Sequence, residues 1–123
     1  MFNISYNGII TVNRGDSFRM PLVLNVGTKL DPKRFELTEN CYVYIGVMEP
    51  NQPFENALIR KTLTYKDVNS KGDLIVKFSP QDTQCILPGK YYYQVKLQVL
   101  NPDDPDDYEV HTIIDKTQFF VLE

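Results

Sequence analysis

The stretch Tyr91-Tyr92-Tyr93-Gln94-Val95-Lys96-Leu97-Gln98-Val99 decides the fold class. Its odd-numbered positions are apolar or aromatic throughout, whereas its later even-numbered positions carry Gln94, Lys96 and Gln98. A two-residue period is that of a β-strand with one buried side and one solvent-facing side. We therefore predict a long strand here, with its odd-numbered residues in a core.

Other segments alternate in the same way and extend the prediction outward from this strand. In the last of them, residues 108–122, the apolar positions shift from one alternation phase to the other, which predicts a β-bulge near Asp115-Lys116. The Arg14-Gly15-Asp16 motif and the Pro88-Gly89 pair are typical of chain reversals. Clear strand patterns cover residues 18–26, 41–47 and 74–78, and weaker ones cover 9–12, 58–65 and 108–122.

Proline positions and helix signals limit the alternatives. Pro21 lacks a backbone donor, so its strand is predicted to lie at a sheet edge or to carry a bulge. The helix-start signals at Asp31-Pro32 and at residues 79–82 each predict no more than a single turn. The segment 101–107 is rich in aspartate and proline and is predicted to be an exposed acidic loop.

About seven short strands with almost no helix predict an all-β fold, an immunoglobulin-like antiparallel β-sandwich that forms one domain over residues 1–123. The turn before the strand at 91–99 resembles the one that enters the sixth strand of immunoglobulin domains, where a tyrosine hydroxyl bonds to upstream backbone. Tyr91 is the candidate for that role, with Asp82 and Gly89 as further structural residues. The chain has no tryptophan, and its cysteines do not fall on the second and sixth strands, which excludes an ordinary antibody-type domain.

Composition and charge limit the partners and the cellular location that we expect for this chain. The chain has 13 basic and 16 acidic residues and no basic cluster, which disfavours nucleic acid as a partner. No apolar run approaches the length of a membrane span, and the first residues do not resemble an export signal. Cys41 and Cys85 are predicted to be reduced, half-buried thiols, with one disulfide as the alternative.

No catalytic machinery is visible in the sequence. His111 is the one histidine, so a hydrolase would have to be centred on it; a solvent-facing side chain is the competing interpretation. The acidic segment lacks the spacing of an EF-hand, which leaves calcium as a weak alternative, and the cysteines and histidine lack zinc-ligand spacing. We predict no enzyme activity, no cofactor and no metal, and we interpret Arg14-Gly15-Asp16 as a hairpin turn rather than a recognition sequence.

Aromatic residues on the solvent-facing side of three strands are the more informative feature. If Val43 and Ile45 face the core, the tyrosines that alternate with them face outward. Exposed tyrosines offer a large contact area for a partner, although cross-strand tyrosine pairs also stabilise a sheet by themselves. The predicted interface comprises Tyr42, Tyr44, Tyr92, Gln94, Lys96, His111 and Ile113.

The order of several segments resembles the N-terminal β-sandwich domain of phage baseplate upper proteins. The segments are ITVNRGDSF at 10–18, GDLIVKFSPQDT at 72–83, LPGKYYYQV at 87–95, HTII at 111–114 and FFV at 119–121. Each motif is common by itself, so the resemblance rests on their order and spacing. Members of that family usually continue into a trimeric stalk, whereas this sequence ends at Glu123.

The resemblance implies a non-enzymatic virion structural protein of a tailed phage, made in the cytoplasm of the bacterial host. Its partners would be other phage structural proteins, with a baseplate or tail adaptor and a capsid auxiliary or decoration protein as the two roles, and self-association as a further option. A piece of a longer protein is also compatible with the length. The alternative function is a carbohydrate-binding adhesion module whose tyrosines stack on sugars at a host surface.

Overall fold

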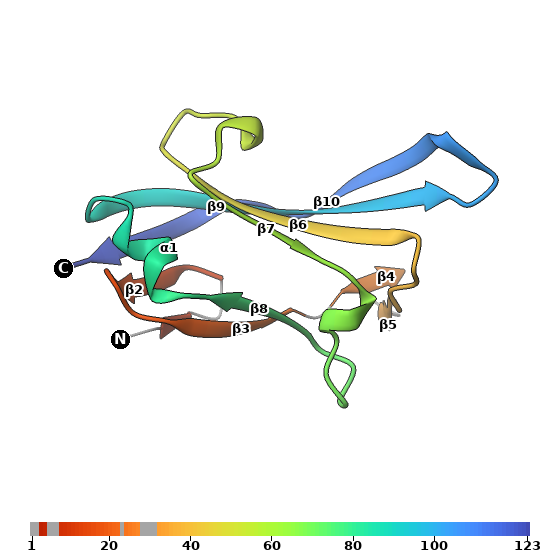
Figure 1. Ribbon diagram of the computed structural model, residues 1–123, viewed down its shortest axis with the longest axis horizontal. Coiled ribbons are helices and arrows are strands. Elements are labelled where there is room, and N and C mark those ends of the chain that lie inside the picture. Colours follow the sequence, from red (N-terminus) through yellow and green to blue (C-terminus); the bar gives the residue numbers. More distant parts are fainter. Residues whose placement is uncertain (1–2, 5–7, 23, 28–31) are drawn as a thin grey trace.

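The alternating stretch at 91–99 forms the middle of β9 (Gly89–Asn101), the central strand of the larger of two facing sheets (Figure 1). The computed structural model describes residues 3–4, 8–22, 24–27 and 32–123. In this sheet the strand order is β1 (Asn3–Ile4), β2 (Ile10–Asn13), β10 (Asp104–Leu122), β9, β6 (Cys41–Met48) and β7 (Ile59–Leu63).

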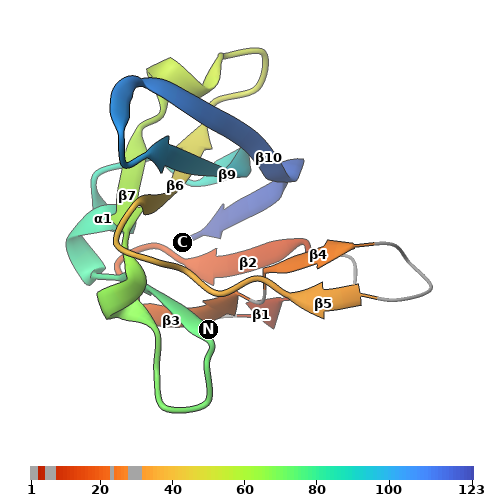
Figure 2. The ribbon, with the colours of Figure 1, turned by 90° about the vertical axis from the view of Figure 1, so that its right-hand side faces the viewer.

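The facing sheet consists of β3 (Phe18–Leu22) and β8 (Leu74–Phe78), which pair antiparallel from Phe18 opposite Phe78 to Leu22 opposite Leu74. A further small sheet pairs β4 (Asn25–Gly27) with β5 (Pro32–Arg34). Figure 2 shows the three sheets from the side. The remaining elements are short: the helix α1 (Pro80–Gln84) and the 3-10 turns η1 (Phe54–Asn56) and η2 (Tyr65–Asp67).

This arrangement confirms the predicted immunoglobulin-like β-sandwich. As in immunoglobulin domains, the strands β10, β9 and β6 are neighbours in one sheet and β3 and β8 form the other. One pairing departs from the antiparallel prediction, because β2 runs parallel to the end of β10, with Ile10 opposite Phe119 and Val12 opposite Val121. The parallel pairing places β2, near the start of the chain, beside the C-terminal end of β10.

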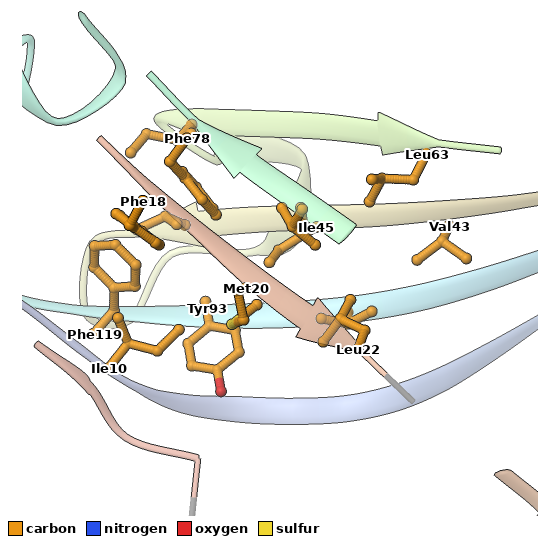
Figure 3. Packing of buried hydrophobic residues seen from close by; sticks show 14 of the residues in the cluster. Ile10, Phe18, Met20, Leu22, Val43, Ile45, Leu63, Phe78, Tyr93 and Phe119 are labelled. Atoms are coloured by element: carbon orange, nitrogen blue, oxygen red, sulfur yellow. The ribbon is translucent and has the colours of Figure 1, made fainter. Parts of the chain in front are cut away.

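The core lies between the inner faces of the two sheets (Figure 3). The Phe18 and Phe78 rings stack with their centroids 4.5 Å apart, and the Phe119 ring lies 6.3 Å from each. Tyr93 meets Phe119 edge-on, and its buried hydroxyl donates to the carbonyl of Gly8. The odd-numbered side chains of β9 are buried from Tyr91 to Leu97, as the alternation predicted.

Three local predictions were wrong for identifiable reasons. Residues 18–26 do not form one strand: β8 begins at Leu74, the partner of Leu22, so the chain beyond Leu22 has no partner in that sheet and pairs with β5 instead. Pro32 begins a strand rather than a helical turn, because its segment pairs with β4; Asp31 lies outside the described residues. The aspartates of the acidic segment, at 103, 104, 106 and 107, are exposed as expected, but β9 and β10 continue into this segment as a hairpin rather than a long loop.

The turn at Arg14-Gly15-Asp16 carries the chain from β2 to β3, and therefore from one sheet to the other. Gly15 has the expected positive φ of 85°, but the flanking strands do not form a hairpin with each other. The turn is held by α1: the Arg14 guanidinium donates two hydrogen bonds to the carbonyl of Gln84, and the Gly15 N–H donates to Thr83 Oγ1 at 2.9 Å. These contacts favour the structural interpretation of the motif.

The segment that enters β9 behaves as predicted. Ser79 and Asp82 form a capping box at the start of α1, with the Ser79 N–H donating to Asp82 Oδ2 at 2.7 Å. The Tyr91 hydroxyl donates to the carbonyl of Leu87 at 2.5 Å, which confirms Tyr91 as the corner tyrosine. Gly89, the third residue singled out here, begins the strand.

Replacing Tyr91 by phenylalanine tests the corner. We expect Tyr91→Phe to lower the free energy of unfolding by about 1 kcal/mol, because the hydroxyl that bonds the Leu87 carbonyl is removed while the ring remains. Urea unfolding followed by circular dichroism measures this loss. The control is Tyr92→Phe, the next residue, whose side chain is on the other face of β9. Equal stability of the two variants would contradict the role of the corner.

The Asp82 carboxylate gives the fold an acid-sensitive contact. Partial burial raises the pKa of Asp82, but the hydrogen bond and charge of Lys61, 2.7 Å away, and the Ser79 hydrogen bonds outweigh it, so the pKa is below its ordinary value of 3.8. A carboxyl with a lower pKa in the folded chain stabilises the fold above its unfolded pKa. That contribution is lost as the pH falls below 3.8 through the folded value.

We therefore expect Asp82→Asn to destabilise the protein more at pH 6 than at pH 3, when the free energies of unfolding are measured in urea at both values. The exposed carboxylate Glu55 in η1 supplies the control, Glu55→Gln. A loss of stability in Asp82→Asn that is the same at both pH values would show that the ionised carboxylate contributes nothing.

Candidate functional site

The outer face of the larger sheet carries part of the predicted interface. Tyr44 lies opposite Lys96 and Tyr42 lies opposite Gln98 in the antiparallel pairing of β6 with β9. The Tyr44 hydroxyl donates to Gln98 Oε1 at 2.8 Å, and the Tyr42 and Tyr44 rings are nearly parallel, 6.5 Å apart between centroids. All four side chains are half-buried, so the two tyrosines and Lys96 form a continuous, ordered surface as predicted.

A loop covers the neighbouring part of the same face. Residues 49–58 cross the sheet on the side opposite β3 and β8, and contain η1 (Figure 1). Phe54 and Ala57 lie so close to Gly46 that an added Cβ would come within 2.9 Å of the Phe54 ring and 3.0 Å of the Ala57 Cβ. The Lys96 ammonium lies 5.0 Å from the centre of the Phe54 ring, at the border of the covered part.

Gln94 lies in the part of the sheet that the loop covers, so it does not belong to the candidate interface. The Gln94 residue is only 9% exposed, and its amide donates to Asp115 Oδ1 at 3.1 Å. Lys116 fixes the loop from the other side by donating to the carbonyl of Gln52. Tyr92 lies farther along β9, opposite Met48, so the covered row of Gln94 separates it from Tyr44. Tyr92 is half-buried, with the Lys90 ammonium 5.4 Å from its ring centre.

His111 was predicted to share the outer face, and this is wrong. His111 lies opposite Leu97, and Leu97 points into the core, so His111 belongs to the inner face of β10. Its side chain is nevertheless 55% exposed, since the β9–β10 hairpin projects beyond the facing sheet (Figure 1). The ring bonds to Glu109 on the same strand, 3.3 Å away.

The structure also places Ile113 differently from the prediction, and one irregularity in β10 explains the errors at both His111 and Ile113. Thr112 lies opposite Lys96 and Ile114 lies opposite Val95, so two steps along β10 correspond to one step along β9. Ile113 is the extra residue of this bulge; it is half-buried and packs against the core. The predicted irregularity near Asp115-Lys116 is confirmed by a second register shift, but the earlier bulge inverts the faces of every residue before it.

Because the bulge inverts the faces of the β10 residues before it, the outer face of the sheet gains residues that were not predicted there from the sequence. Val110 lies opposite Gln98 and Tyr108 opposite Leu100, which places them on the outer face; Val110 is 52% and Tyr108 53% exposed. The alternation of Tyr108, Val110 and Thr112 was visible in the sequence, but their face depended on the position of the bulge. We call the resulting surface the tyrosine face: Tyr42, Tyr44, Lys96, Gln98, Leu100, Tyr108, Val110 and Thr112.

Side chains at the acidic hairpin tip, next to the tyrosine face, form hydrogen bonds with groups of the tip itself. Asp107 accepts from the Asn101 amide at 3.0 Å, and Asp104 accepts from the backbone of Asp106 at 3.1 Å. Within residues 3–4, 8–22, 24–27 and 32–123, no three histidine, cysteine or acidic side chains converge as metal ligands would. Both cysteines are free thiols, so the disulfide alternative is wrong; Cys41 is buried and Cys85 exposed, so neither is half-buried as predicted.

A groove of about 480 Å³ lies at the other end of the facing sheet, lined mainly by Leu22, Leu24, Phe35, Leu37 and Tyr65. Glu36, Ser70 and Lys71 also line it, so its surface is both apolar and polar. Among the described helices, none has the length and apolar character needed to cross a membrane.

Comparisons with known proteins add no relative to this description. No protein-family profile matches the chain, and neither the curated proteins nor the solved structures include a significant match.

Gly46 tests whether the loop is fixed on the sheet. We expect Gly46→Ala to displace residues 52–58, because the new Cβ would meet both Phe54 and Ala57; overpacking of this kind costs about 1–3 kcal/mol. Hydrogen exchange should become faster across the loop, including at the Leu58 N–H that bonds the Val47 carbonyl. Thr62→Ala, on the same face and outside the loop, is the control. Unchanged exchange in Gly46→Ala would show that the loop is already mobile.

Proposed function

We propose that this chain is a non-enzymatic virion structural protein of a tailed phage, an immunoglobulin-like module that docks on other phage structural proteins through the tyrosine face. The ordered sequence motifs shared with baseplate upper proteins support the phage assignment. The β-sandwich is the fold that this resemblance implies.

The single observation that carries the docking role is the combination of exposure and order on the tyrosine face. Tyr108 and Val110 are each about half exposed, and the Tyr44 hydroxyl is held by Gln98. A tyrosine that is already held in one rotamer loses little conformational entropy when a partner covers it. Aromatic residues on such ordered surfaces are enriched among those that dominate binding energy.

The charge of the tyrosine face also suits a protein partner. Lys96 is its one ionisable cation, and the remaining side chains are aromatic, aliphatic or neutral polar. A stable interface buries about 800 Å² on each partner. The expected partner surface is apolar, with an acidic group placed to meet Lys96 once both are withdrawn from water. In the phage particle this surface would belong to the tail or baseplate hub, or to the capsid.

The experiment compares the occupancy of variants in assembled phage particles. We expect the double variant Tyr42→Ala with Tyr44→Ala to fold, as judged by circular dichroism, and to be depleted at least about tenfold from purified particles, because two aromatic anchors are removed. Quantitative mass spectrometry of the particles measures the occupancy. The control is Arg19→Ala with Lys77→Ala, two exposed residues on the solvent side of the facing sheet.

Two results would overturn the proposal in different ways. Absence of the unmodified chain from particles would reject the virion assignment. Equal occupancy of the two double variants would reject the tyrosine face as the docking surface. The carbohydrate-binding alternative remains a prediction, since half-exposed tyrosines also stack on sugars; calorimetry with free glycans that gives saturable binding, lost in Tyr42→Ala with Tyr44→Ala, would favour it.

A further inference from the structure

One long edge of the larger sheet has no partner strand in the described part of the chain. Strand β10 pairs with β9 along one side, but β2 covers its other side only from Phe119 to Leu122. The preceding part of β10 is therefore an edge, and it lies on the projecting hairpin (Figure 1). Unpaired backbone N–H and C=O groups along an edge form a template for another strand.

The segment 108–112 is the part of this edge best suited to pairing. Each residue from Tyr108 to Thr112 follows β9 in unbroken register, whereas bulges interrupt β10 on both sides of it. All five residues are exposed. Bulges, prolines, short strands and charged side chains commonly block edge-to-edge pairing. Within 108–112 the one such device is the carboxylate of Glu109, so pairing requires a register that gives this carboxylate a partner.

The side chains of this segment are complementary to those of a second copy in one register. If two copies pair antiparallel about a twofold axis at Val110, Glu109 lies opposite His111 of the second copy, and His111 lies opposite Glu109 of the second copy. An imidazole opposite a carboxylate donates a hydrogen bond to it when neutral and adds an opposite charge when protonated, whereas like charges directly across a strand pair destabilise it. An axis at Glu109 would oppose the two Glu109 carboxylates, and an axis at Thr112 would oppose Glu109 to Asp115.

We propose that this edge of β10 binds a second copy of the chain, forming a symmetric dimer whose twofold axis passes through Val110. The axis stands perpendicular to the sheet, so the two tyrosine faces lie on the same side and meet at the paired Val110 residues. Tyr108 then lies across from Thr112 of the second copy. The dimer does not depend on the proposed virion function, because it rests on the edge and its side-chain pattern alone.

Disulfide trapping tests the register directly. In a Cys85→Ser background, which removes the exposed thiol, Val110→Cys places two thiols opposite each other at the axis. Opposed residues of paired strands have their Cα atoms about 4.5–5.5 Å apart, within the range of a disulfide. We expect a covalent dimer on mild oxidation. The matched control is Thr62→Cys in the same background, an exposed position on β7 at the opposite edge of the sheet.

Analytical ultracentrifugation provides the second measurement, without oxidation. The unmodified chain is expected to show a reversible monomer–dimer equilibrium. Val110→Asp should weaken the dimer about tenfold or more, because it opposes two carboxylates at the axis. Gln98→Glu, on the same face but one strand inside the edge, should dimerise nearly as well as the unmodified chain, with circular dichroism confirming that both variants fold. A monomeric unmodified chain at millimolar concentration, or cross-linking of Val110→Cys no faster than that of Thr62→Cys, would overturn the proposal.

Discussion

The aromatic contact between the two sheets is the interaction on which the rest of the structure depends. Phe18 and Phe78 come from adjacent strands of the small facing sheet, and Phe119 reaches them from β10 of the larger one. A two-stranded sheet has little stability by itself, so β3 and β8 persist because their inner face is buried against the other sheet. The same contact fixes the face that β9 and β10 turn toward solvent, which is where the candidate interface lies.

The extent of the candidate interface is set by which parts of the larger sheet remain uncovered. On the inner side, the facing sheet ends before the β9–β10 hairpin does, which leaves His111 exposed although it shares a face with buried Leu97. On the outer side, the loop containing Phe54 covers Gly46 and Gln94. What remains is the tyrosine face on one side of the hairpin and an open backbone edge along β10, two surfaces of different chemistry on one element.

The projecting hairpin also links surface chemistry to local irregularity. The bulge at Ile113 allows β10 to place Ile114 in the core while Thr112 and Val110 point outward. Without the extra residue, Val110 would face the same side as Leu97, and His111 would take its place beside Tyr42 and Gln98. One inserted residue therefore determines that the outer surface is apolar and that the ionisable pair Glu109 and His111 lies on the opposite side.

Local sequence patterns by themselves determined the all-β class and the buried side of β9, from alternation, and the short helical turn at 79–82 and the corner tyrosine, from turn motifs, because each of these depends on residues close in sequence. It also placed Tyr42, Tyr44 and Lys96 correctly, since β6 and β9 pair without a break. Only the tertiary structure decided that Gln94, His111 and Ile113 are not exposed on the outer face of the sheet. The covering loop and the exact position of a bulge follow from packing between distant segments, and a one-residue change in register reverses every side chain before it.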